Sequence, residues 1–205
     1  MSQPTTGTRL SRSDQAGMYM TIVLGAVGIA ITLWVMVQRL LEVLPGRDVP
    51  VLVPFVDETA PLPIGPGGAA VDVAVDQAIV TVPQPAAATQ FAIIAQPIVV
   101  GVAIVAGIVL LGLLCWNLAR GRAFTRQNTR IVWTGAAVLT VGWVFGSLFT
   151  TMSVNGALAA VSDHTYDGVL FSTDFTAMFG LLALGVVGAA FQIGERLQRD
   201  TEGLV

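Results

Sequence analysis

An arginine-rich segment lies between two long apolar runs of the chain. The segment spans residues 117–130 (NLARGRAFTRQNTR) and holds four of the ten basic residues, all of which are arginine. The flanking runs, 91–116 and 131–152, are each long enough to cross about 30 Å of hydrocarbon. Because clustered arginine in a short loop is typical of the cytoplasmic side of a membrane protein, this segment predicts the direction of every span.

Two further apolar runs complete the prediction of an all-α membrane protein with four transmembrane helices. The chain is 54% hydrophobic and only 11% charged, whereas about a quarter of an ordinary soluble domain is charged. The first helix is expected at 18–40 and the fourth at 171–194, with cytoplasmic tails at 1–17 and 195–205. Arginine without lysine, with abundant Ala, Val and Gly, indicates a bacterial protein, so we expect a multi-pass protein of the cytoplasmic (inner) membrane. The arginines then on the cytoplasmic side are Arg9, Arg12, Arg120, Arg122, Arg126, Arg130, Arg196 and Arg199.

Residues 41–90 differ from the apolar runs and are expected to form a small β-rich extracytoplasmic segment. The stretch 49–56 (VPVLVPFV) suits an edge strand, since proline cannot donate a hydrogen bond to a ladder. Residues 71–76 (VDVAVD) alternate with period two, and 79–82 continue the β-branched enrichment. The alternative, a proline-rich loop that lies on the bilayer, stays open. A second extracytoplasmic loop is expected at 153–170.

The sequence shows no constellation for catalysis, metal binding or cofactor binding. Cys115 is the only cysteine and His164 the only histidine. One cysteine cannot form an internal disulfide, and a zinc site needs three or four converging ligands. The single histidine cannot be placed beside a serine or threonine nucleophile with an orienting acid. We therefore expect no enzymatic activity, no metal and no cofactor.

Two polar residues near or within the apolar runs are candidates for a transport pathway. Ionisable residues at bilayer depth usually mark such pathways, and Asp174 is the only acidic residue close to the interior of a predicted span. Its alternative place is the outer interface near a helix start, where the helix dipole favours a carboxylate. Gln96 lies in the second predicted span, where it lines a polar pathway or joins helices by hydrogen bonds.

Small residues predict close helix packing in the last two spans. Gly142 and Gly146 are four apart in the third span, and Gly185 with Gly188 forms a comparable notch in the fourth. Such notches let helix backbones approach closely. They serve packing within one bundle or a face between two copies of the chain.

Two segments of the chain resemble a bacterial family of four-span membrane proteins whose activity is unknown. Gly121-Arg122-Ala123-Phe124 is followed by Asn128 and an apolar run, and the chain ends in FQIGERLQRDTEGLV from Phe191. The resemblance implies a similar length and an outer segment after the first span. Some members are encoded beside small helix-turn-helix regulators, which implies a membrane partner for a transcription factor. The resemblance implies no ligand for the outer segment.

The expected function is that of a non-enzymatic membrane protein in an interaction, regulatory or sensory role. Its partners would be the lipid bilayer and a membrane or cytoplasmic protein, with a homo-oligomer left open and no direct binding of nucleic acid. The alternative is a small transporter or channel component. Arginines near the bilayer surface also fix topology and contact anionic headgroups. The candidate partner or lipid contacts are Arg120, Arg122, Phe124, Arg126, Asn128, Arg130, Glu195 and Arg199.

Overall fold

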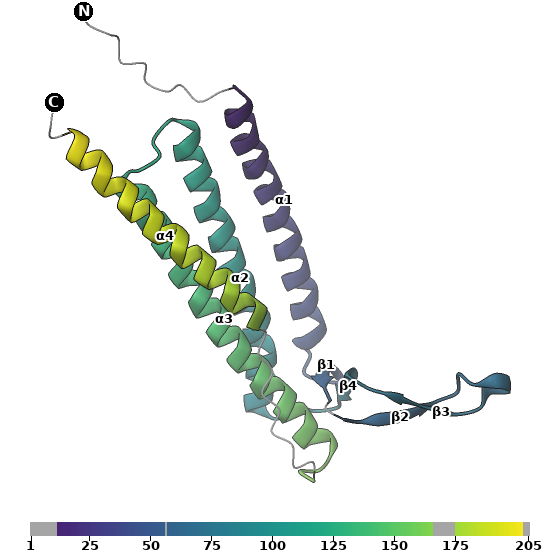
Figure 1. Ribbon diagram of the computed structural model, residues 1–205. Helices are drawn as coiled ribbons and strands as arrows, with labels where there is room; N and C mark the ends of the chain where they lie inside the picture. Colours follow the sequence, from purple (N-terminus) through teal and green to yellow (C-terminus); the bar gives the residue numbers. More distant parts are fainter. Residues whose placement is uncertain (1–11, 56, 166–174, 203–205) are drawn as a thin grey trace, which may run out of the picture. The chain divides into compact units, whose positions relative to one another are not determined.

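The computed structural model describes residues 12–55, 57–165 and 175–202 of the chain (Figure 1). Among these residues are four helices that are long and apolar enough to cross a membrane. This confirms the predicted four-helix architecture and the small β segment between the first two helices. The helices are α1 (Arg12–Val43), α2 (Ala87–Ala119), α3 (Arg126–Val161) and α4 (Phe175–Glu202).

The third helix is longer than the sequence predicted, because α3 continues to Val161. Residues 153–161 were expected in a loop, but their polar side chains bond within the helix. The Ser153 hydroxyl donates to the carbonyl of Phe149 (2.7 Å), and the Asn155 amide donates to that of Thr151 (2.9 Å). The helix ends where Asp163 and His164 adopt left-handed backbone angles, with φ of 51° and 62°.

The arginine-rich loop is shorter than predicted. The helix α2 ends at Ala119 and α3 begins at Arg126, so only residues 120–125 connect them. Gly121 has a φ of 76°, which glycine adopts at little cost just after a helix. The remainder of the predicted 117–130 loop therefore belongs to the two helices.

The chain divides into two compact units. The first contains residues 1–36, 99–144 and 174–205, and the second contains residues 37–98 and 145–173. The helices α1, α2 and α3 each contribute one part to each unit, whereas the described part of α4 belongs to the first.

Small residues bring the helices of the first unit together. The predicted packing residue Gly142 is buried, and a Cβ built there would collide with the Cβ of Ala103 in α2. Gly25 of α1 lies against Ile108 of α2, where an added Cβ would be 3.0 Å from a side-chain carbon. These contacts agree with the use of glycine for close helix approach.

The other three glycines of the predicted notches behave differently from one another. Gly188 lies under Trp133, where an added Cβ would be 3.2 Å from the indole ring. Gly146 is buried within α3. Gly185 is the exception, since a Cβ there would meet open space among the described residues. No helix of the described chain packs on Gly185, so its part in a face between two copies stays a prediction.

The β segment of the second unit is a two-stranded antiparallel ribbon in two sections. In the basal section, β1 (Val49–Pro54) pairs with β4 (Gln77–Val82). In the distal section, β2 (Thr59–Leu62) pairs with β3 (Val71–Ala74), and the chain turns back through a short 3-10 helix, η1 (Pro66–Gly68). Each strand has a free edge, which accommodates the prolines of β1 as predicted for an edge strand.

The basal section of the ribbon is held by the hydrophobic core of the second unit. Alternate residues of β1 turn inward, and Val49 and Val53 are fully buried. The amide of Gln90 in α2 donates to the carbonyl of Val43 at the end of α1 (2.7 Å), which joins the two ends of the segment. The buried residues of this core are Val43, Val49, Val51, Val53, Val82, Ile93, Val154, Ala157 and Leu158.

We predict that Gly142→Ala destabilises the protein by about 1 to 3 kcal/mol, because the added methyl forces the helix backbones at Ala103 apart. The matched control is Gly185→Ala, which adds the same methyl to open space and is expected to be neutral or to stabilise by up to about 1 kcal/mol. Thermal unfolding of the detergent-solubilised protein measures both. Equal effects of the two substitutions would contradict the assignment of Gly142 to a helix contact.

Candidate functional site

The loop between α2 and α3 is organised by one buried side chain, that of Asn128. Its Nδ2 donates to the carbonyls of Arg122 (2.5 Å) and Ala123 (2.8 Å), and its Oδ1 accepts from Asn117 of α2 (2.8 Å). Asn128 is fully buried. This side chain therefore shapes the loop, and its role as a partner or lipid contact stays a prediction.

The start of α3 is capped by Thr125. Its hydroxyl oxygen accepts a hydrogen bond from the backbone N–H of Asn128 (3.3 Å), which satisfies one of the free donors of the first helical turn. The cap and the Asn128 amide together fix the point at which the chain enters α3.

An aromatic contact attaches the loop to α4. The Phe124 ring lies on Gly194, where a Cβ would collide with it, and its centroid is 5.7 Å from that of Phe191. Phe124 keeps 45% of its surface exposed, so it remains partly accessible. Its neighbours show that packing on α4 is one role of this residue.

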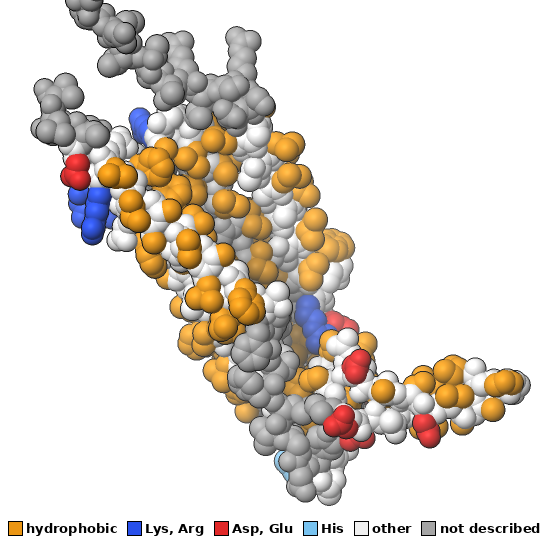
Figure 2. All heavy atoms as spheres, viewed as in Figure 1, with side chains coloured by type: hydrophobic (Ala, Val, Ile, Leu, Met, Phe, Trp, Pro, Cys, Tyr) orange, Lys and Arg blue, Asp and Glu red, His pale blue; other side chains and the backbone are white. Residues whose placement is uncertain are grey.

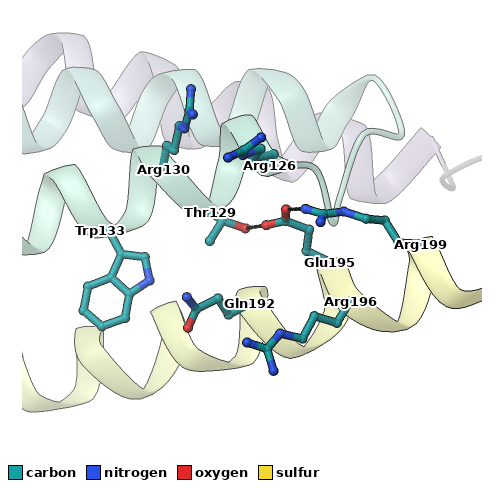
Figure 3. Close-up of a pocket in the computed structure, with 8 residues that line it drawn as sticks. All are labelled: Arg126, Thr129, Arg130, Trp133, Gln192, Glu195, Arg196 and Arg199. Atoms are coloured by element: carbon teal, nitrogen blue, oxygen red, sulfur yellow. Dashed lines mark hydrogen bonds and ion pairs between the residues drawn. The ribbon is translucent and has the colours of Figure 1, made fainter.

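A charged groove lies between the first turns of α3 and the last turns of α4 (Figure 3). Its volume is about 400 Å³. The buried carboxylate of Glu195 forms its floor, accepts a hydrogen bond from the Thr129 hydroxyl (2.8 Å) and pairs with Arg199 one turn later. The residues that line the groove are Arg126, Thr129, Arg130, Trp133, Gln192, Glu195, Arg196 and Arg199.

Sequence reasoning found four of these eight residues and missed the other four. Thr129, Trp133, Gln192 and Arg196 were absent from the predicted contacts. A signal was present, since residues 126, 129, 130 and 133 have the spacing i, i+3, i+4, i+7, and residues 192, 195, 196 and 199 repeat it. That spacing places each set on one face of its helix.

The two other predicted arginines of this region lie outside the groove. The guanidinium of Arg120 lies over the Trp116 ring, 4.5 Å from its centroid, in cation–π geometry. Tyr19 of α1 meets the same ring edge-on at 6.0 Å. Arg122 is exposed on the loop.

The predicted pathway residue Gln96 lies in the second unit and lines a different pocket of about 290 Å³. Arg39 contributes to the same pocket; it pairs with Glu42 (2.5 Å) and donates to the carbonyl of Pro50 (2.7 Å). Asp174, the other pathway residue, lies outside the described residues.

Within the described ranges, no group of three or more His, Cys, Asp or Glu side chains is arranged to hold a metal ion. The comparisons with known proteins add no assignment. No family model, no curated protein and no solved structure matches this chain.

We predict that Asn128→Asp destabilises the protein by about 2 to 4 kcal/mol. The carboxylate has nearly the same shape but cannot donate to the carbonyls of Arg122 and Ala123, which lose their partners. The matched control is Gln127→Glu, an exposed neighbour with the same change of charge, which should leave the melting temperature nearly unchanged. Similar melting temperatures for both variants would show that the loop does not depend on the amide.

Proposed function

We propose that this chain is a non-enzymatic integral membrane protein that binds a partner protein through its β ribbon. In this proposal the ribbon is extracytoplasmic and the loop between α2 and α3 is cytoplasmic, as the arginine distribution favours. The observation that carries the proposal is the exposed apolar face of the ribbon's distal section. The basal section holds the ribbon in place by burying one face in the core, while its other face exposes Leu52 and Ile79.

The distal section has two unlike faces. Leu62 is paired with Val71 and Ala60 with Val73, and alternation along each strand puts these four side chains on one face. Leu62 and Val71 are 45% and 41% exposed, and Ile64 beyond them is 65% exposed. Figure 2 shows hydrophobic side chains over the far end of the ribbon. An exposed apolar face on a firmly held element is typical of an interaction surface.

The charge of the ribbon indicates the kind of partner. Residues 49–82 contain four acidic residues and no basic one: Asp57, Glu58, Asp72 and Asp76. This charge disfavours close contact with an anionic bilayer surface, which would repel it. It favours a protein whose apolar surface is flanked by basic residues.

A photo-crosslinking amino acid at Ile64 tests this proposal in native membranes. We expect one adduct of discrete mass, and we expect Leu62→Ser with Val71→Ser to reduce it strongly. The matched control is Thr59→Ser with Ala74→Ser, an exposed pair on the opposite face of the same section, which should leave the adduct intact. An adduct of twice the 21.4 kDa chain mass would identify the partner as a second copy. No adduct, or equal loss in both double variants, would contradict the proposal.

The second candidate function, transport, rests on the pocket at Gln96, whose lining mixes polar and apolar side chains. That pocket combines the side chains of Gln96, Arg39, Thr150 and Ser153 with part of β1. If it belongs to a pathway, Gln96→Leu abolishes solute or ion flux in proteoliposomes, because the lining loses its amide. Flux that Gln96→Leu leaves unchanged would remove Gln96 from the pathway.

A further inference from the structure

The groove between α3 and α4 carries more positive charge than its own residues neutralise. Four arginines and one glutamate line it, which gives a formal net charge of +3 (four minus one). Glu195 is already engaged by Thr129 and Arg199. The side chains of Arg130 and Arg196 form no hydrogen bond or ion pair with any other described residue. The groove therefore holds guanidinium groups without a carboxylate partner in the described chain.

The arginines stand on both walls of the groove. Figure 3 shows Glu195 between Thr129 and Arg199, with Arg126 close to this cluster, while Arg130 and Arg196 extend from α3 and α4 in different directions. Planar guanidinium groups match the oxygens of a phosphate in paired hydrogen bonds. Long arginine side chains on facing helices can close around such a group from two sides.

The groove changes from polar to amphipathic along its length. Arg126 and Arg199 lie at one end, next to the start of α3 and the last turns of α4. Trp133 and Gln192 lie at the other end, about two turns further into the helices. Tryptophan is enriched at headgroup level in membrane proteins, where its ring is apolar and its N–H donates.

The helix surface beyond Trp133 is apolar. Gly188 receives the Trp133 ring, and the next turns of α4 carry Gly185 and Leu181 on the same face. A ligand that enters the groove with an anionic end therefore meets an apolar helix surface at its other end. From the cationic end to the apolar end, these surfaces match the parts of an anionic phospholipid in order: the phosphate, the polar linkage and the acyl chains.

We propose that this groove is a binding site for a phosphate-bearing headgroup, with an anionic phospholipid as its ligand. Arg126 contacts the phosphate, and the long side chains of Arg130 and Arg196 turn toward the groove to reach it when the ligand binds. Trp133 and Gln192 face the polar linkage. Glu195 is a positioning residue, because it fixes Arg199 and joins the two walls through Thr129. The site is independent of the partner protein proposed for the ribbon.

The test is a titration of the purified full-length protein in mild detergent. Phosphatidylglycerol, phosphatidylcholine and inorganic phosphate are added separately. Bound lipid is measured by native mass spectrometry, and the melting temperature is followed in parallel. We expect the protein to bind phosphatidylglycerol more tightly than phosphatidylcholine. We also expect Arg130→Gln with Arg196→Gln to weaken phosphatidylglycerol binding about tenfold to 30-fold, since both guanidinium groups lose charge-assisted hydrogen bonds to the phosphate that arginines outside the groove do not make.

The matched control is Arg120→Gln with Arg122→Gln, which removes the same charge from the neighbouring loop and leaves the groove intact. It should change the affinity by less than about twofold. The single variants Arg196→Gln and Arg122→Gln repeat the comparison with one charge, so that a poorly folding double variant does not decide the result.

Each outcome is decisive. A rise in melting temperature with inorganic phosphate alone, lost only in the groove variants, would support the site with free phosphate as its source. Binding that requires the lipid supports the proposal as stated. Equal losses in groove and loop variants would overturn it in favour of general surface charge. No loss in the groove variants, or equal binding of phosphatidylcholine, would overturn it as well.

Discussion

Every backbone polar group that enters a bilayer must find its hydrogen bond within the protein, and the four long helices of this chain meet that demand by themselves. The apolar side chains of these helices do little to determine which helices pack together, since lipid tails are equally apolar. The pairing of helices in the first unit relies instead on a few particular contacts. Gly142 admits Ala103, and Glu195 meets Thr129. The groove is a consequence of the second contact.

Much of the fold could be predicted because it depends on local patterns. Length and composition indicated the four helices, and proline with period-two alternation indicated the strands of the 49–82 ribbon except β2 (Thr59–Leu62), whose residues look like a turn or loop. The end of α3 could not be read this way. Ser153 and Asn155 look like loop residues in the sequence, yet each hydrogen-bonds to the preceding helical turn. Their neighbours Val154, Ala157 and Leu158 are also buried against strands that lie far away in the chain.

The candidate site was harder to predict, since its residues come from two helices that are distant in sequence. Thr129 and Glu195 are 66 residues apart, and neither helix alone reveals that its polar face meets the other. Asn128 was recognised as part of a motif, but its role depends on its burial and on loop carbonyls that a sequence does not locate. Gly185 and Gly194 show the same limit. The motif pointed to Gly185, whereas Gly194 supports the Phe124 ring.

The contacts that attach α4 have a consequence for the order of assembly during synthesis. Its aromatic and polar partners meet it at Gly188 in the middle of the helix and at Phe191, Gly194 and Glu195 in the second half. A ribosome releases the apolar first half earlier, when these attachment points have not yet emerged. The fourth helix would therefore enter the lipid first and join α3 afterwards. Before that step, the arginines of α3 are exposed to whichever anionic molecules surround the nascent chain.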